Sequence, residues 1–300
     1  MSLVTLTVHF VLIQVTLASC AVAGISQDHG QTALSRAPIL FAFLINLGIP
    51  PLLSLQAIYG PLFYSGSILM AWQWIAVIPS LICVYGLIYF ARYTKSLPCS
   101  RKAALLAAIG ILGIAFIYSN MVSWMSHPGG WAESYQKAGT HLYPRRGETV
   151  LRWAWILGPA LCWMGWLWPA RFRALFFSGI IVSSAAFVAL FRVADYHLAS
   201  GTMNCQWGSL AILAVVGFLG LDSSGAVRGV VKWALVVDSF CKVLTRHWIR
   251  QSLIGDQYNF LSIPVQTQQS VLIAVAGTFV LGGVMGLWMW EKIRKEGISI

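Results

Sequence analysis

Charged side chains are scarce in this chain. They make up 10% of its 300 residues, whereas a soluble globular protein carries about 25%. Apolar residues make up 58% of the sequence, and uncharged runs near the roughly 20 residues that cross a bilayer as a helix recur along its whole length. The shortage of charge argues against a soluble protein and predicts an all-α integral membrane protein.

Common catalytic and metal-binding signatures are also missing. The sequence has no CxxC or CxxCH pattern, which argues against a zinc knuckle and against haem attached covalently to this chain. It has no GxSxG, Walker A, HExxH or GxGxxG pattern either, so common hydrolase, P-loop and dinucleotide-binding functions lack support. We predict no metal site. The six cysteines lie mostly in apolar runs, as small buried side chains do: Cys20, Cys83, Cys99, Cys162, Cys205 and Cys241.

Negative charge is scarcer than positive charge, and the net charge is +11. Lysine and arginine fall almost wholly between the apolar runs, which favours membrane loops facing anionic lipid headgroups over a nucleic-acid surface. The chain also contains 14 Trp, 15 Phe and 10 Tyr, which suits many helix ends at the lipid–water boundary. We therefore expect contact with the lipid bilayer and no nucleic-acid partner.

The apolar runs predict a single polytopic domain over residues 1–300, a bundle of about nine transmembrane helices. Eight is the alternative, because Lys232, Asp238 and Lys242 lie in one run, which could be an interfacial amphipathic helix. The second run contains Pro50-Pro51, and we expect these prolines to break that helix. The predicted spans are 3–25, 38–60, 67–91, 103–125, 153–169, 174–194, 205–221, 226–248 and 268–290.

The distribution of lysine and arginine predicts the orientation in a bacterial inner (cytoplasmic) membrane. The side opposite the N-terminus contains twelve of these residues, and the positive-inside rule makes that side cytoplasmic. The N-terminus and the long extramembrane loop 126–152 are then extracytoplasmic, and the C-terminus is cytoplasmic. The N-terminal side contains eight: Lys137, Arg145, Arg146, Arg152, Arg192, Lys242, Arg246 and Arg250.

Five of the six histidines fall toward the N-terminal side of the predicted bundle: His9, His127, His141, His197 and His247. Histidine ligates b-type haem and hydrogen-bonds quinone oxygens, so a one-sided group suits a redox site. His9 lies inside a span, and His127 or His197 would be its partner in a bis-histidine haem site. The same pattern also arises from ordinary polar residues in loops and at the interface.

A second candidate site lies where the sixth run ends. Asp195 and His197, next to Arg192, can accept protons from a quinol and relay them to water. The competing interpretation is a charged helix end that stops the span. Asp238 and Lys242 are one helical turn apart in the eighth run, and an intramembrane pair of this kind can be functional or purely structural.

Uncharged polar groups define a third candidate site, around Pro50-Pro51 in the second run. Asn46 and Gln56 flank these prolines, and their amides could line a quinone or substrate cavity. Hydrogen bonding between helices without any ligand explains such amides equally well.

Two stretches resemble a known family. They are INLGIPPLLSLQAIYGPLFYSGSILMAWQWIAVIPSLICVY at 45–85 and TRHWIRQSLIGDQYNFLSIPVQTQQS at 245–270. They resemble a poorly characterised family of polytopic, cytochrome-b-like bacterial membrane subunits associated with multihaem c-type cytochromes. In that pattern a histidine precedes the second helix and another opens the fifth. The corresponding stretches here, 31–36 and 152–155, contain no histidine, so the resemblance leaves a haem b uncertain while keeping a quinone or scaffold role.

Three functions are compatible with these observations. The first is a membrane subunit of a respiratory-type electron-transfer complex, which anchors an extracytoplasmic c-type cytochrome and exchanges electrons with the quinone pool. The second is a haem-free structural anchor that holds other redox subunits at the membrane. The third is a small-solute or ion transporter that uses the proline-containing helix and the Asp238/Lys242 pair, although the sequence has no visible inverted repeat.

Overall fold

The computed structural model describes residues 2–26, 30–136, 146–194, 200–221 and 225–254. Within these residues the chain is helical and contains no strand. Six helical segments are long and apolar enough to cross a membrane, which confirms the prediction of a helical, multi-pass membrane protein. These segments are Leu3–Ile25, Gly30–Met70, Trp72–Tyr93, Leu97–Ser126, Phe172–Arg192 and Met203–Gly220.

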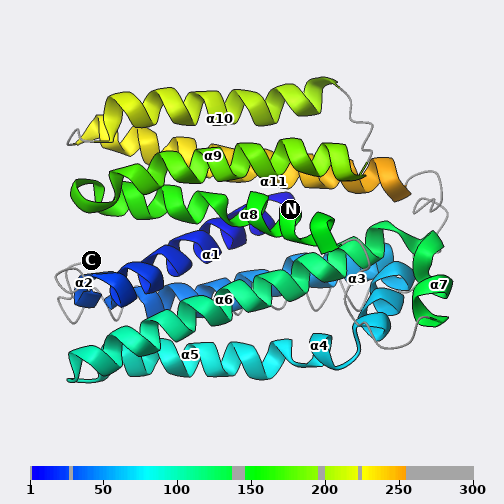
Figure 1. The fold of residues 1–300 in the computed structure, drawn as a ribbon, viewed down its shortest axis with the longest axis horizontal. Coiled ribbons are helices and arrows are strands. Elements are labelled where there is room, and N and C mark those ends of the chain that lie inside the picture. The colour runs from blue at the N-terminus through cyan, green and yellow to red at the C-terminus, as the bar shows by residue number, and fades with distance from the viewer. Residues whose placement is uncertain (1, 27–29, 137–145, 195–199, 222–224, 255–300) are drawn as a thin grey trace.

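The long helices run back and forth along one axis of the molecule (Figure 1). Eight of the nine predicted spans fall on a long helix, and the ninth, 268–290, lies outside the described residues. The long helices are α1 (Ser2–Ile25), α3 (Ala37–Met70), α5 (Val77–Tyr93), α6 (Leu97–Ser126), α8 (Arg146–Leu167), α9 (Pro169–Ala194), α10 (Ser200–Gly220) and α11 (Ala226–Ile254). Shorter helices connect them: α2 (Gly30–Leu34), α4 (Trp72–Ile75), the 3-10 turn η1 (Pro128–Gly130) and α7 (Trp131–Gln136).

Helix α1 is the centre of the bundle. It packs against α3 and α6 on one side and against α8 and α11 on the other, and Figure 1 shows it crossing between these two groups. Small residues such as Ala18, Cys20 and Ala23 are buried on it, which lets several neighbouring helices approach closely. Large apolar side chains such as Ile75 and Leu219 are exposed at the periphery, where a membrane protein meets lipid rather than water.

The prediction that the second helix breaks at Pro50-Pro51 is wrong. Helix α3 passes through both prolines, which are buried, and its one non-helical residue is Tyr59, with φ −118° and ψ 31°. The distortion lies directly before Gly60-Pro61. Pro61 has no amide hydrogen to donate to the carbonyl four residues earlier, and its ring crowds that carbonyl, so the helical turn that contains Tyr59 is strained. Gly60 adds backbone freedom in the same turn.

Two predicted boundaries also change. The third span is predicted at 67–91, but α3 continues to Met70 and the chain turns at Ala71, where φ is 49°, so the next long helix begins at Val77. The fifth span is predicted at 153–169, but α8 begins at Arg146, inside the segment 126–152 that was predicted as an extramembrane loop. Glu148 and Arg152 then lie in the first turns of α8, where they form an i,i+4 ion pair that supports the helix.

Helix α11 turns its charged face inward. Asp238 and Lys242 are 0% exposed, whereas Trp233 is 63% exposed and Val237 and Phe240 are also exposed. An interfacial amphipathic helix has the reverse arrangement, with apolar residues on the protein or lipid side and charges toward water. The inward charges are the reason this helix has too polar a sequence to resemble an ordinary span.

Candidate functional site

Four ionisable residues follow one another at intervals of one helical turn along the inward face of α11: Asp238, Lys242, Arg246 and Arg250. A spacing of four residues keeps side chains on the same side of a helix. The first two form an ion pair, in which Lys242 Nζ donates to Asp238 Oδ2 over 2.6 Å. The predicted pairing of Asp238 with Lys242 is therefore present, and it is fully buried.

The carboxylate of Asp238 also binds to α10. Its Oδ1 accepts hydrogen bonds from Gln206 Nε2 at 3.3 Å and from Ser209 Oγ at 3.1 Å. A buried charge is tolerated when it is both paired and hydrogen-bonded. The ion pair thus has the satisfied geometry of a structural connection between α10 and α11.

A buried glutamine connects three helices beside this pair. Gln14 of α1 donates from Nε2 to the carbonyl of Ile156 in α8 at 3.1 Å. Its Oε1 accepts from Trp163 Nε1 at 3.2 Å and from Ser239 Oγ at 3.1 Å. Gln14 therefore ties α1 to α8 and α11, and the residue is 0% exposed.

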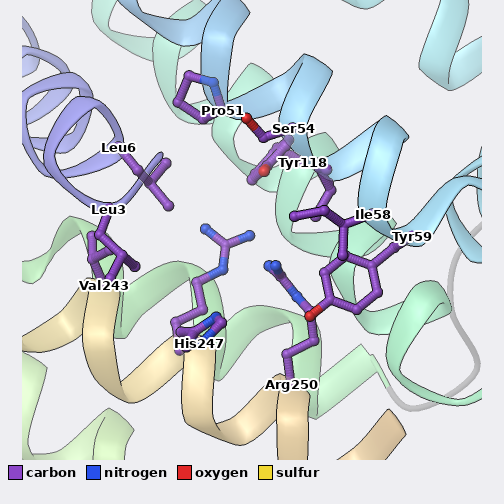
Figure 2. A pocket seen from close by; sticks show the side chains of 12 residues that line it. Leu3, Leu6, Pro51, Ser54, Ile58, Tyr59, Tyr118, Val243, His247 and Arg250 are labelled. Carbon is purple, nitrogen blue, oxygen red and sulfur yellow. The ribbon is translucent and has the colours of Figure 1, made fainter. Parts of the chain in front are cut away.

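A cavity of about 80 Å³ lies next to the last two members of the α11 row. Four helices line it, and Figure 2 shows Leu3 and Leu6 of α1 on one side and His247 and Arg250 of α11 facing Ser54, Ile58 and Tyr59 of α3. The remaining lining residues are Pro51, Leu55, Tyr118, Val243 and Arg246. The walls are apolar on the α1 side and rich in hydrogen-bond donors on the α11 side.

Arg246 brings an uncompensated positive charge to this cavity. It is 3% exposed, and its Cζ lies 5.0 Å from the ring centre of Tyr118 and 5.6 Å from that of Phe10. The Nη1 atom of Arg246 has no hydrogen-bond partner. Among the described residues, no carboxylate forms an ion pair with it. A buried cation with an unused donor favours a ligand that carries oxygen atoms or negative charge.

Arg250 adds a second cation at the same cavity. Its Cζ lies 5.1 Å from the ring centre of Tyr59, and no ion pair to it is present in the described part of the chain. A cation on an aromatic face is stabilised without being neutralised. The cavity therefore combines two arginines, an imidazole and two phenols with no neutralising acid among its lining residues.

A third arginine at this end of the bundle is neutralised. Arg152 of α8 donates from Nη2 to Glu148 Oε1 at 2.8 Å, and both residues are buried. His127 Nε2 lies 3.9 Å from Glu148 Oε2, and Thr149 donates to Ser123 across the α6–α8 contact at 3.1 Å. This cluster holds the end of α6 against the start of α8.

The structure places only some of the predicted site residues at the cavity. His247 and Pro51 line the cavity. Asn46 is exposed and donates to Ala42 O within its own helix at 2.9 Å, and Gln56 is half-buried outside the cavity lining. Asp195, His197 and His141 lie outside the described residues.

His9 lies in the contact between α1 and α3. Its Nδ1 is 2.9 Å from the carbonyl oxygen of Leu44. The imidazole also packs on the backbone of Gly48, where a Cβ atom would come within 2.7 Å of His9 Cε1. His9 thus has an interhelical contact of its own, and only Nε2 remains to bind a ligand.

Sequence reasoning misses the two arginines as site residues. It counts Arg246 and Arg250 only as positive charges on the N-terminal side, although they continue the four-residue spacing of Asp238 and Lys242. That spacing, with apolar residues on the opposite face, is the available signal. Tyr59 and Tyr118 carry no comparable signal, because each lies in a different apolar run.

Comparisons with protein-family models, with curated proteins and with solved structures give no match. The cavity and the residues around it are therefore the basis on which a function can be assigned.

Proposed function

We propose that the protein is a membrane subunit of a respiratory-type electron-transfer complex and that it binds a quinone in the cavity between α1, α3, α6 and α11. The observation that carries this proposal is the pairing of apolar walls with Arg246, a buried cation whose Nη1 is unused. A ligand pocket of this type is mostly apolar with a few convergent polar groups.

The chemistry of a quinone matches both sides of such a cavity. Its ring and isoprenoid tail are apolar and suit Leu3, Leu6 and Ile58. Its two carbonyl oxygens gain negative charge on reduction, and the donors Arg246 and Arg250 would stabilise that charge in a low-dielectric site. Protons enter or leave at the same oxygens, and an imidazole such as His247 is a suitable group to exchange them.

We further propose that α11 crosses the membrane and that the end of the bundle where α1 begins is extracytoplasmic. Arg152, Lys242 and Arg246 are buried, so they are not loop charges. Removing these three from the eight counted on the N-terminal side leaves five. The opposite side keeps twelve, because none of its described members is buried. The corrected imbalance supports the same orientation more strongly.

The proposed partner is an extracytoplasmic c-type cytochrome, docked at the end of the bundle that carries α7 and the cavity. Support comes from the sequence resemblance at 45–85 and 245–270. The cavity adds support, because residues near the start of α1 and near the end of α11 line it. A cytochrome there would lie on the side of the membrane from which quinol electrons leave. Co-purification of a c-type cytochrome with tagged protein from native membranes tests this part.

Binding of a short-chain quinone to purified protein in nanodiscs tests the central proposal. We expect saturable binding, a fall in affinity of about tenfold or more for Arg246→Met, and a smaller fall for Arg246→Lys, which keeps the charge. Arg36→Gln is the matched control, because Arg36 is an exposed arginine at the start of α3. Circular dichroism and size exclusion show that each variant is folded.

Three results would contradict the proposal in different ways. Unchanged quinone affinity in folded Arg246→Met would exclude this cavity as the quinone site. If anionic phospholipid displaces the bound short-chain quinone and quinol does not compete with it, the cavity is a lipid headgroup site. No quinone binding, no b-type haem bands after dithionite, and retained cytochrome co-purification would indicate the haem-free anchor.

The transporter alternative receives no support from the Asp238/Lys242 pair. Both side chains are buried and bonded to each other, and neither lines the cavity. A transport site needs access for its solute, and both residues of this pair are 0% exposed.

A further inference from the structure

Two cysteines from different helices have their sulfur atoms in contact. Cys205 of α10 and Cys241 of α11 are 36 residues apart, and their Sγ atoms are 3.0 Å from each other. All six cysteines of the chain lie in described residues, and this is the one pair whose thiols hydrogen-bond each other. Neither residue lines the cavity of the proposed function.

We propose that Cys205 and Cys241 are a redox-active pair that forms a disulfide between α10 and α11. A disulfide has an S–S length of about 2.05 Å, so the sulfurs need to approach by about 1 Å. Helices α10 and α11 already pack along their lengths, and small side-chain rotations supply an adjustment of this size. The bond closes a loop that includes the connection between the two helices.

The oxidant that suits this location is a membrane quinone. Cys241 is buried, but Cys205 is half-buried, and its neighbours Met203 and Trp207 on α10 are exposed to the lipid side. In the reaction both S–H bonds break and one S–S bond forms. The two electrons and two protons pass to the quinone oxygens and give one quinol. This pair is independent of the cavity, because it needs only a collision with quinone at the lipid-facing surface.

The disulfide would brace the buried ion pair. Cys205 precedes Gln206, and Cys241 precedes Lys242. Gln206 and Ser209 are the two residues of α10 that bind the carboxylate of Asp238. A disulfide therefore links α10 to α11 next to Gln206, which binds Asp238, and next to Lys242.

Thiol counting on unfolded protein tests the proposal. Protein purified from aerobic cells without reductant is unfolded in SDS, so that burial protects no thiol, and treated with a maleimide polymer. We expect four labels before reduction and six after it. The peptides that contain Cys205 and Cys241 should be linked in the non-reduced digest. Cys205→Ser should give five labels without reduction, because it frees Cys241.

The quinone step has its own measurement. Reduced protein in nanodiscs is mixed with a short-chain benzoquinone, and we expect one quinol and the loss of two thiols per protein. Cys83→Ser is the matched control, since Cys83 is exposed, and it should leave the reaction unchanged. Cys205→Ser should abolish it. Six labels before reduction, together with no thiol loss on treatment with quinone, would overturn the proposal.

The outcome is separable from that of the proposed function. Arg246→Met should weaken quinone binding at the cavity and leave the Cys205–Cys241 disulfide intact. If the disulfide forms in cells but quinone does not regenerate it from the thiols, the disulfide stands and the assigned oxidant is wrong. If quinone binds the cavity and the thiols stay reduced, only the disulfide proposal fails.

Discussion

At the scale of single residues, the contact between Asp238 and Lys242 has the largest predicted effect on stability. Asp238→Asn leaves Lys242 buried with its charge unpaired, and removal of one partner of such a pair costs about 3–5 kcal/mol. We expect a matching loss in the free energy of unfolding, measured by SDS titration or thermal unfolding in detergent. Lys232→Met is the control. Lys232 is exposed on the same helix, so its loss should change stability by less than about 0.5 kcal/mol.

The double variant separates pairing from burial. Asp238→Asn with Lys242→Met removes both charges, so the unpaired charge no longer exists. We expect it to be less destabilised than the sum of the two single variants, with an interaction energy of about 1–3 kcal/mol. Simple additivity of the two single changes would show that Asp238 and Lys242 do not stabilise each other.

Gln14 and Asn46 are both amides in apolar runs, yet they should behave differently. Gln14→Leu removes three interhelical hydrogen bonds and leaves Trp163 Nε1 without an acceptor, so we expect a loss of about 1–3 kcal/mol. Asn46 is exposed and bonds only its own helix, and Asn46→Leu should be nearly neutral. Adding Trp163→Phe to Gln14→Leu should cost less than it does in the wild type. Equal effects at Gln14 and Asn46 would refute the distinction.

At the scale of helices, α8 and α9 approach so closely that their glycines are required. A Cβ atom on Gly179 of α9 would lie 2.7 Å from the carbonyl oxygen of Gly158 and 2.9 Å from the amide nitrogen of Cys162. Backbone atoms cannot rotate away, so Gly179→Ala forces the helices apart. We expect a loss of about 1–3 kcal/mol in the free energy of unfolding.

Gly113→Ala is the matched change on α6. No atom lies within 4 Å of the Cβ position there, and alanine favours the helix by about 0.5–1 kcal/mol over glycine. This variant should therefore be slightly stabilised in the same unfolding assay. If the Gly179 and Gly113 variants shift stability in the same direction, close packing of α8 on α9 is not the cause.

The inverted amphipathicity of α11 makes a further prediction at this scale. Val237 is exposed in the middle of α11, so in a membrane-spanning helix it faces lipid. Val237→Lys then places a charge in the hydrocarbon, which costs about 2–3.5 kcal/mol on insertion scales. We expect a lower yield of folded protein in membranes, whereas Gln251→Lys, exposed near the end of the helix, should be tolerated. Equal yields would favour an interfacial α11.

At the scale of the whole molecule, the orientation can be tested with thiol reagents that do not cross membranes. The 3-10 turn η1 directly precedes α7, and α6 begins at the opposite end of the bundle from α7 (Figure 1). Gly129 of η1 and Cys99 in the first turn of α6 are both exposed. In intact spheroplasts we expect Gly129→Cys to be labelled and Cys99 to be labelled only after the membrane is opened. The reverse pattern would place the cavity on the cytoplasmic side.

The fold is largely predictable from sequence, and the site is not. Long apolar runs locate most helices, because span length and hydropathy are local properties. The predicted break at Pro50-Pro51 is wrong, because the effect of a proline on α3 depends on the packing around it. Arg246 enters the sequence analysis only as a positive charge on the N-terminal side, because a cation in sequence carries no sign of which neighbours bury it. The histidine pattern includes His247, which lines the cavity, but also His9, which packs on Gly48 and lies against the carbonyl of Leu44.

The order of amino acids alone established a helical membrane protein with an excess of positive charge and an unusual polar run near residue 240. A bilayer requires long apolar segments whose backbone groups form hydrogen bonds within the segment. Both properties depend on residues close together in the sequence. The fold decided that α11 turns its charges inward, that Arg246 meets Tyr118 at a cavity, and that Cys205 touches Cys241. These contacts join residues on different helices, so they depend on how each helix is rotated and packed, which no single segment encodes.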